Sequence, residues 1–343
     1  MSPAPVVLGI ETSCDETAAA VVRGGRVLSS VVSSQADLHS VYSGVVPELA
    51  SRAHMERVAS VMERAVRGAF GGAPLSSAKG RLGAVAFTRG PGLAGALLVG
   101  KVAAQALARA AGLPLVGVNH LEAHALAIAL ALPQRRLFPY LALIASGGHT
   151  DLLWVEAPGR YRVLGRTRDD AAGEVFDKVA KLLKLPYPGG PSVERAGRSG
   201  DPSAVPFPRP ILPGCWDFSF SGLKTAVLYH VRDHAPKKAG ARFVSDICAS
   251  FQEAVVDTLI EKTLSAAEHL GARRVVLGGG VAANGRLREK FLARAGRVEV
   301  LFPPLSLCTD NAAMIAHAGS LRLKRPLERV LRIDPNLPVR SWS

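Results

Sequence analysis

Apolar and polar residues follow the same order in two separate blocks of the chain. Residues 6–32 run from an apolar segment (VVLGIE) through a small polar turn, a second apolar segment and a glycine turn to a third segment. Residues 139–165 repeat that order, with segments of strand length and breaks that have turn composition. Each block is therefore predicted to form a three-stranded meander.

The two meanders are each followed by the same series of elements. In both halves a helix leads to a strand, a glycine-containing break, a second helix, another strand and a last helix. The later elements of the first half are expected at 81–87, 93–112, 114–118 and from 119, and those of the second at 243–271, 272–278, 286–296, 298–302 and from 308. Each half is thus a β-β-β-α-β-α-β-α unit, which implies a mixed sheet covered by helices on both faces.

Two such halves facing each other predict an α/β fold of two actin-like lobes, the ASKHA or ribonuclease-H-like architecture, with a nucleotide in the cleft between the lobes. The boundary is expected near Arg136, which gives an N-terminal lobe at 1–136 and a C-terminal lobe at 137–321. A C-terminal helix around 322–343 is expected to cross back and complete the N-terminal lobe. The polar turns DET and SGGHT would then face each other across the cleft.

The composition is that of a globular protein with an unusual charge. The chain has 343 residues, of which 48% are hydrophobic and 20% charged, so it is long enough for two domains and not disordered. A net charge of +14 favours polyanionic partners such as nucleic acid or an anionic lipid face, although a GC-rich genome also enriches Arg. Four dispersed cysteines without a CxxC pair argue against a disulfide framework and a zinc ribbon. With no leader-like start and no run of 18 apolar residues, we expect a soluble cytoplasmic protein without membrane association.

Two glycine-rich loops follow apolar strands and could hold a phosphate. In SGGHT, Ser146, Gly147 and Gly148 stand where backbone N–H groups can approach an anion, and residues 278–284 (GGGVAAN) also open a helix. Either loop alone is more often a tight turn, but their matching positions in the two halves favour a nucleotide site. The segment GALLVGK at 95–101 is better explained as core helix than as a Walker A loop, because Val102 stands where Ser or Thr must bind magnesium.

A pair of histidines lies in the otherwise apolar segment NHLEAHA. On a helix, His120 and His124 project from one face and can share a metal ion, although two separate histidines bonded to backbone groups would give the same spacing. Asp310, in CTDNAAM, occupies the equivalent position of the second half, so the repeat could bring it to the histidines. Two histidines and one carboxylate with open positions suit zinc or ferrous iron. Glu122 lies about 200° around the helix from His120, which argues against an HExxH protease.

At this point the motifs resemble those of one family, TsaD, once called glycoprotease and the bacterial counterpart of the KEOPS catalytic subunit. The match runs in order from about Leu8 to Ala318. It is carried by GIETSCDET, GVVPELASRAH, NHLEAH, SGGHT, DDAAGEVFDKVAKLL, YPGGP, FSFSGLKTAV, GGGVAAN and CTDNAAM. The resemblance implies a tRNA N6-adenosine threonylcarbamoyltransferase, a metal-dependent acyltransferase. Such an enzyme moves threonylcarbamoyl from threonylcarbamoyl-AMP to the adenosine just 3′ of the anticodon, position 37, in tRNAs that read codons beginning with A.

The resemblance also implies the site residues. One divalent metal per subunit, Fe²⁺ or Zn²⁺, would be held by His120, His124 and Asp310. Asp15 and Glu16 of the SCDET turn would be required for catalysis. Substrate would be bound by a larger set, whose pocket could also hold ATP, ADP or AMP: Ile144, Ala145, Ser146, Gly147, Gly148, Asp177, Gly190, Glu194 and Asn284.

Some of these assignments have competing explanations. Asp177 lies among helix-surface charges, where a solvated carboxylate is the commoner case. Glu194 stands where some members have an Asp that binds a ribose hydroxyl, Asp151 stands where Gln is common, and Ala283 where the family has similar small residues. None of these departures touches the predicted metal ligands.

The family resemblance further implies partners. These are tRNA, a TsaB-like paralogue expected to pack on the helical region at 46–68, and a TsaE-like ATPase; a homodimer stays open. Two other classes compete with the transferase: an actin-fold kinase, which needs a magnesium-binding Asp and no histidine pair, and a nucleotide-dependent scaffold, which needs no open metal site.

Overall fold

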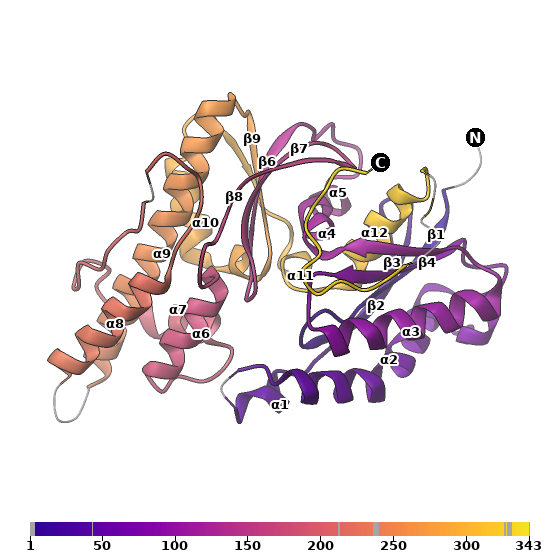
Figure 1. Cartoon of the computed structure of the whole chain (residues 1–343), viewed down its shortest axis with the longest axis horizontal. Helices are drawn as coiled ribbons and strands as arrows, with labels where there is room; N and C mark the ends of the chain where they lie inside the picture. Colours follow the sequence, from indigo (N-terminus) through magenta and orange to yellow (C-terminus); the bar gives the residue numbers. More distant parts are fainter. Residues whose placement is uncertain are drawn as a thin grey trace.

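The computed structural model describes residues 4–42, 44–211, 213–235, 240–325, 327 and 331–342. Two sheets lie side by side, each with helices packed against it (Figure 1). The two halves of the chain occupy opposite sides of the molecule, except that the C-terminal part, in yellow, lies against the first half. This is the two-lobed architecture that the repeat predicts.

The two sheets have the same topology. The first has the strand order β3-β2-β1-β4-β5 and the second the order β10-β9-β6-β7-β8. In each sheet the meander strands pair antiparallel and the strands that follow pair parallel. The strands are β1 (Val6–Glu11), β2 (Glu16–Arg23), β3 (Arg26–Ser34), β4 (Ala84–Gly90), β5 (Leu115–Asn119), β6 (Tyr140–Ala145), β7 (Thr150–Ala157), β8 (Arg160–Arg166), β9 (Arg274–Gly278) and β10 (Glu299–Leu301).

Helices cover both faces of the first sheet. Helices α2 (Pro47–Ala69) and α3 (Ala94–Ala111) bury their apolar residues on one face, and α4 (His120–Leu126) and α12 (Ala312–Arg322) pack on the other. Short elements join these: α1 (Ala36–Ser40), η1 (Leu75–Ser77) and α5 (Ile128–Ala131).

The second sheet packs against α6 (Ala172–Leu182), α9 (Ala241–Leu270) and the residues after β9 in one large apolar core. Three helices, α6, α7 (Gly189–Gly197) and α8 (Ser221–His234), stand between β8 and α9 and have no counterpart in the first half. The half is completed by η2 (Gly280–Ala283), α10 (Gly285–Arg294) and α11 (Leu305–Cys308).

The element that returns to the first sheet differs from the one expected. Helix α12 makes the crossing, and it ends at Arg322. The expected helix around 322–343 is wrong where the structure describes it: residues 323–325, 327 and 331–342 are turns and extended chain. Pro335 and Pro338 remove backbone donors and disfavour helix before them, which explains the difference. Residues 326, 328–330 and 343 lie outside the described part of the chain.

Helix α12 packs directly on the backbone of the first sheet, because glycines leave no side chain between the two. A Cβ added to Gly9 of β1 would lie 2.3 Å from the carbonyl oxygen of Ala312 and 2.5 Å from the backbone nitrogen of Ala316. On the other side of the contact, a Cβ on Gly319 would lie 2.5 Å from Cβ of Ala86. Glycine at these two positions lets the helix backbone touch the sheet.

Within the described residues, no helix has both the length and the apolar character that crossing a membrane requires.

Replacement of Gly9 by Ala should destabilise the protein by about 1–3 kcal/mol, because the new methyl group forces α12 away from β1. Urea unfolding followed by circular dichroism measures the change. Gly222→Ala is the matched control, since nothing lies within 4 Å of a Cβ added in α8, and it should stay within about 1 kcal/mol of the parent. Equal effects of the two substitutions would contradict the close-contact explanation.

Candidate active site

The two histidines lie at the start of α4 because of the residue before them. The side-chain Oδ1 of Asn119, at the end of β5, accepts hydrogen bonds from the backbone nitrogens of Leu121 (3.0 Å) and Glu122 (3.1 Å). This N-cap begins the helix at His120. The rings of His120 and His124 have centroids 4.7 Å apart, and both side chains are buried.

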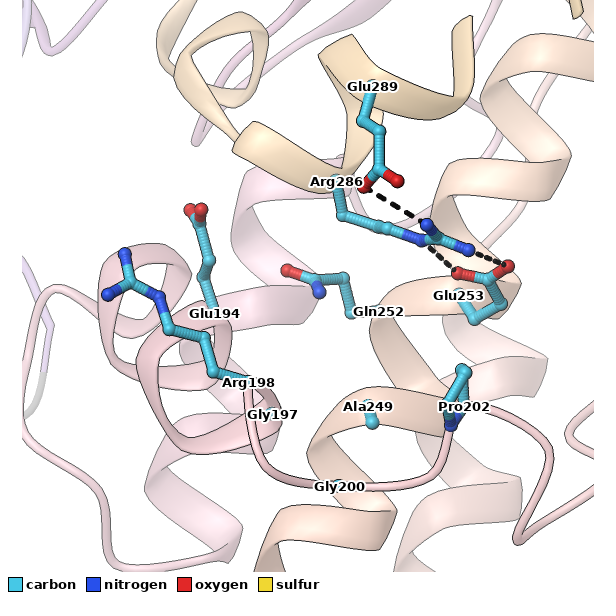
Figure 2. A pocket seen from close by; sticks show the side chains of 10 residues that line it. All are labelled: Glu194, Gly197, Arg198, Gly200, Pro202, Ala249, Gln252, Glu253, Arg286 and Glu289. Carbon is cyan, nitrogen blue, oxygen red and sulfur yellow. Dashed lines mark hydrogen bonds and ion pairs between the residues drawn. The ribbon is translucent and has the colours of Figure 1, made fainter. Parts of the chain in front are cut away.

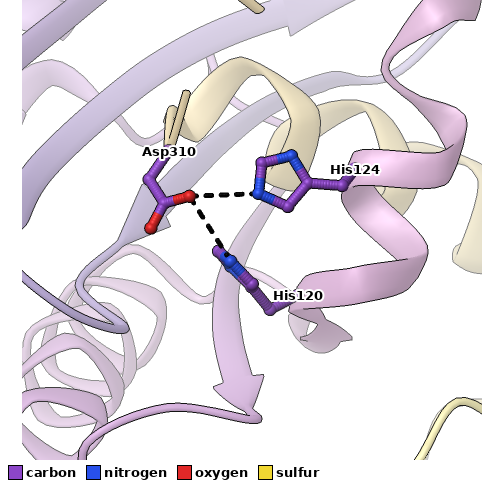
Figure 3. A group of neighbouring side chains, drawn as sticks. All are labelled: His120, His124 and Asp310. Atoms are coloured by element: carbon purple, nitrogen blue, oxygen red, sulfur yellow. Dashed lines mark hydrogen bonds and ion pairs between the residues drawn. The ribbon is translucent and has the colours of Figure 1, made fainter. Parts of the chain in front are cut away.

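Asp310 joins the histidines from the other end of the chain. It stands directly before Asn311, whose side chain caps α12 by accepting from the backbone nitrogen of Met314 (3.0 Å). Its Oδ1 lies 3.0 Å from Nε2 of His124 and 3.5 Å from Nε2 of His120 (Figure 3). The possible ligand atoms of the three residues lie within 4.8 Å of one another. The repeat therefore predicted the convergence correctly, and separate histidines bonded only to backbone do not describe this site.

A fourth buried residue, Glu11 at the end of β1, orients His120. Its Oε2 lies 3.0 Å from Nδ1 of His120 and accepts from the hydroxyl of Thr88 (2.7 Å). A carboxylate on the outer nitrogen of a histidine leaves Nε2 directed inward, an arrangement typical of metal-binding histidines. Glu11 was not predicted as a site residue, although it is a single charged residue at the end of an otherwise apolar strand.

In the histidine–aspartate group, burial and the neighbouring opposite charges both shift the pKa values. Burial alone would lower the pKa of His120, but Asp310 and Glu11 raise it well above its usual range. Burial likewise raises the pKa of Asp310, yet the two histidines outweigh it and hold that pKa far below normal. The pKa of His124 is lowered, mainly by burial. A divalent cation would compensate the two carboxylates without protons, so the donor set fits a bound metal.

The acidic turn after β1 lies close to this group. Burial raises the pKa of Glu16 well above its usual range, and the charges of Asp15 and Asp310 raise it further. His54 of α2 holds the turn, with Nε2 2.9 Å from the carbonyl oxygen of Cys14 and Nδ1 2.8 Å from the hydroxyl of Thr17. The sequence analysis did not single out His54, since its partners lie in a distant turn.

The second half approaches the same place from its strand ends. Tyr187, in the connection between α6 and α7, donates from its hydroxyl to Oδ2 of Asp15 (3.3 Å). A Cβ on Gly278, at the end of β9, would lie 3.1 Å from the carbonyl oxygen of His124 and 2.9 Å from Cδ1 of Ile144. The pKa of His149 is lowered to about 4 by burial and by the charge of His120. The SGGHT turn and the DET turn therefore both border the histidine–aspartate group.

The predicted loop after β6 offers open backbone. Ile144 and Ala145 are buried in β6, whereas no atom lies within 4 Å of a Cβ added to Gly147 or Gly148. The nitrogen of Gly173, at the start of α6, donates to the carbonyl oxygen of Ser146 (3.0 Å) and so holds the loop in place. Backbone N–H groups next to empty space are suited to binding an anion.

The other predicted substrate residues form two small groups. Asp177 of α6 accepts from the nitrogen of Gly189 (2.7 Å), beside Gly190, and burial raises its pKa to about 6. The carboxylate of Asp177 is therefore shielded from solvent, which argues against the alternative of a fully solvated carboxylate on the helix surface. Glu194 of α7 lies near Asn284 (Nδ2 to Oε2, 3.4 Å), and its Oε1 accepts from the nitrogen of Gly285 (3.1 Å).

A cavity of about 280 Å³ opens beside Glu194 (Figure 2). Gln252 of α9 lines it and accepts a hydrogen bond from Nδ2 of Asn284 (2.8 Å). Arg286 of α10 lies on the other side, bound through two nitrogens to Glu253 at 2.8 and 3.0 Å. These three residues were not predicted from the sequence, because Gln252 and Glu253 of α9 lie on a surface that only the fold turns toward Arg286 of α10.

Comparison with known proteins assigns the family. A family model described as TsaD, tRNA N6-adenosine threonylcarbamoyltransferase, matches residues 26–317. The chain belongs to the TsaD family. A relative from Anaeromyxobacter dehalogenans (strain 2CP-C) is 57% identical over 326 residues, 93% of this chain and 94% of its own. One from Geobacter metallireducens is 54% identical over 333 residues, 96% and 95% of the two chains. Both carry the name tRNA N6-adenosine threonylcarbamoyltransferase. As a TsaD protein this chain is a tRNA-modifying transferase.

Solved structures with little sequence identity to this chain share its fold. HypF of T. kodakarensis superposes with a TM-score of 0.64 at 14% identity, covering 94% of this chain and 49% of that one. Component A of the (R)-2-hydroxyglutaryl-CoA dehydratase of Acidaminococcus fermentans gives 0.54 at 14% identity, with 93% and 99% covered. The TsaD chain therefore has the actin-like fold that its sequence predicts.

The Glu253 cluster beside the cavity should make stability depend on pH. Burial raises the pKa of Glu253, but Arg286 and Lys290 outweigh it and lower the value to about 2, against 4.5 for a free Glu. The contribution is therefore present above about pH 4.5 and is lost as the pH falls toward 2. Glu253→Gln should cost about 1–2 kcal/mol at pH 7 and much less near pH 3.

Urea unfolding at the two pH values checks this prediction. Glu289→Gln is the control, because Glu289 also contacts Arg286 but is 69% exposed, so its loss should cost under about 0.5 kcal/mol. A cost for Glu253→Gln that does not change with pH would show that the ion pairs do not stabilise the fold.

Proposed function

We propose that this TsaD chain transfers threonylcarbamoyl from threonylcarbamoyl-AMP to N6 of adenosine 37 in tRNAs that read codons beginning with A. The observation that carries the proposal is the convergence of His120, His124 and Asp310, with donor atoms within 4.8 Å, beside the two polar turns. An actin-fold kinase or a scaffold has no use for such a group. The proposed lobes that frame it are 1–136 and 137–321, and α12, at the end of the second range, packs on the first sheet.

The three residues would hold one divalent cation, Fe²⁺ or Zn²⁺. When bound, the metal supplies Lewis-acid polarisation of a substrate oxygen. The residues of the chain do the orienting: Glu11 fixes His120 through Nδ1, and the Asn119 cap fixes the helix that carries both rings. Burial, with the charge of Asp15, raises the pKa of Glu16, and this residue would donate a hydrogen bond during transfer.

The adenylate would lie along the second half. The loop of Ser146, Gly147 and Gly148 would receive the phosphate through the backbone nitrogens of its two glycines, which lie beside empty space. The nitrogen of Ser146 already donates to the carbonyl oxygen of His149 (2.8 Å). Asp177 and Gly190 would line the path to the nucleoside, and Glu194 would accept from the ribose hydroxyls. The 280 Å³ cavity beside Glu194 and Gln252 has room for part of the adenosine. Ile144 and Ala145 support the loop from the core.

The basic surface suits the tRNA. With a net charge of +14, the chain carries exposed arginines on the edge strand β8, among them Arg160 and Arg162. Two further basic clusters of the sequence, 235–242 and 323–333, lie in part outside the described residues. Phosphate contacts from such residues position a tRNA without reading its sequence. The cytoplasm, where tRNA is modified, is the proposed location.

The exposed side of α2 suits the TsaB-like paralogue. Met55 of α2 is 67% exposed, and Leu98 and Val102 of the neighbouring α3 are 48% and 56% exposed. A group of exposed large apolar residues marks a surface for another protein. His54 connects this helix to the acidic turn, so a partner there would lie close to the catalytic residues. A TsaE-like ATPase and a homodimer complete the proposed assemblies.

His120→Ala should abolish metal retention and lower the transfer rate by at least about 100-fold, because loss of one ligand removes several kcal/mol of stabilisation. Purified protein is assayed for metal content. It is then incubated with tRNA, threonine, bicarbonate, ATP and the enzyme that makes the adenylate, and modified adenosine is measured by mass spectrometry. His234→Ala, an exposed histidine at the end of α8, is the control. A variant that loses the metal and keeps full transfer would refute the metal's role.

Glu194→Gln should weaken AMP binding about 10-fold, because it removes a charged acceptor for ribose hydroxyls. Asn284→Ser should act in the same direction while keeping an oxygen that can cap α10. Calorimetric titration with AMP measures both, and Glu268→Gln on the exposed side of α9 serves as the control. Unchanged affinity in both variants would place the nucleoside elsewhere.

A further inference from the structure

The last described residues of the chain, 331–342, form an extended segment that we call the C-terminal strap. In the first half, the nitrogen of Asp334 donates to the carbonyl oxygen of Arg89 (3.0 Å), and the nitrogen of Gly92 donates to that of Pro335 (3.1 Å). These contacts lie at the end of β4. The strap then continues from the first sheet toward the second, where the chain ends (Figure 1).

The end of the strap is fixed to the second half. The nitrogen of Trp342 donates to the carbonyl oxygen of Gly159 (2.8 Å), and the nitrogen of Tyr161 donates to Oγ of Ser341 (3.0 Å). A Cβ on Gly159 would lie 2.3 Å from the Trp342 ring. The turn between β7 and β8 is thus shaped to receive the indole, and the strap joins the two halves.

Between these anchors the strap holds the helix that carries the histidines. The Nδ2 of Asn119, whose Oδ1 caps α4, donates to the carbonyl oxygens of Leu337 (3.1 Å) and Pro338 (3.2 Å). One side chain therefore connects the first turn of α4 to the strap. Helix α4 has seven residues, too few to hold its own shape without outside support.

Glu122 provides the second attachment of α4. It is 6% exposed and points away from His120, as its position on the helix predicts. Its Oε1 accepts from the hydroxyl of Tyr161 (2.9 Å), and Trp342 lines the same small pocket as Glu122. Glu122, Tyr161 and Trp342 come from α4, β8 and the strap, so residues of both halves meet at one buried carboxyl behind the histidines.

The strap also contacts the helix that follows Asp310. The guanidinium of Arg322, the last residue of α12, lies 5.2 Å from the centroid of the Trp342 ring. Asp310 stands just before the other end of α12. Trp342 therefore contacts the elements that carry both kinds of proposed ligand, the histidines through Glu122 and the aspartate through α12.

We propose that the C-terminal strap positions the metal group, with Glu122, Asn119 and Trp342 as positioning residues that touch neither substrate nor metal. The inference rests on the proposed metal role of His120, His124 and Asp310. Residues behind metal ligands typically change affinity or activity 10- to 100-fold when they are replaced. The strap should therefore affect metal binding and turnover more than nucleotide binding, whose proposed residues lie elsewhere on the second half.

The test compares two substitutions. Trp342→Phe keeps an aromatic ring and removes the indole N–H, and Asn336→Ala changes an exposed residue of the strap. A third variant ends the chain at Leu337. The two substitutions are made in the full-length chain. All three variants are stripped of metal and titrated with Zn²⁺, and their Co²⁺ forms are examined by absorption spectroscopy. Transfer kinetics are measured on the loaded protein. We expect Trp342→Phe and the shortened chain to bind Zn²⁺ about 10-fold more weakly, with an altered Co²⁺ spectrum.

The kinetic expectation separates positioning from general damage. For Trp342→Phe, kcat should fall about 10-fold while KM for threonylcarbamoyl-AMP changes less than about twofold. Glu122→Gln combined with Trp342→Phe should cost less than the sum of the single changes, because both residues line the same pocket behind α4. Asn336→Ala should match the parent in every measurement.

Two results would overturn the inference. Parental Zn²⁺ affinity and Co²⁺ spectrum in folded Trp342→Phe would do so, as would equal changes in kcat and KM. If the shortened chain does not fold, Trp342→Phe alone decides. His120→Ala is measured in parallel: if it still binds Zn²⁺ normally, the metal proposal itself fails, whereas its loss of Zn²⁺ with normal strap variants removes the strap inference alone.

Discussion

The site depends on a direct contact between the backbones of α12 and β1. Asp310 can reach the two histidines only if the helix after it lies on the first sheet, although the strands before it belong to the second. Gly9 makes this possible, because any side chain there would occupy the space of the Ala312 carbonyl. A packing requirement in the sheet thus determines where a carboxylate stands in the site.

This contact brings several buried charges together, and their balance shapes the chemistry. Glu11, Glu16 and Asp310 bring three carboxyls close to two histidines in a region with little solvent. Unpaired burial of so many carboxylates is costly, so each has a partner or a raised pKa. Glu11 and Asp310 are stabilised as anions by His120, whereas Glu16 favours its protonated form. A cation placed among them would relieve the excess negative charge.

The elements that repeat in the two halves, and the local motifs, could be predicted from the sequence. Contacts between segments that are far apart in the sequence could not be predicted. The two meanders, the two mixed sheets and the approach of Asp310 to His120 follow from matching elements in two halves. Glu11 and His54 were missed because their partners lie in distant segments. Helices α6–α8 interrupt the repeat, so the repeat could not predict them. A helix was expected at 322–343, although the prolines of the strap disfavour helix there. The strap contacts, such as Asn119 with Leu337, join residues more than 200 positions apart, beyond any local pattern.

Asp151 shows how the fold accommodates a departure from the family pattern. The resemblance to the family leads to an expected Gln at this position, directly after SGGHT, and Asp151 is 7% exposed. Burial raises its pKa to about 6, and Arg166, its neighbour across the β7–β8 pair, acts in the opposite direction. A buried carboxylate is tolerated beside a cross-strand arginine, where a neutral amide would need no such partner. The substitution is therefore a local matter of β7 and β8, and it leaves the open backbone of Gly147 and Gly148 available to a ligand.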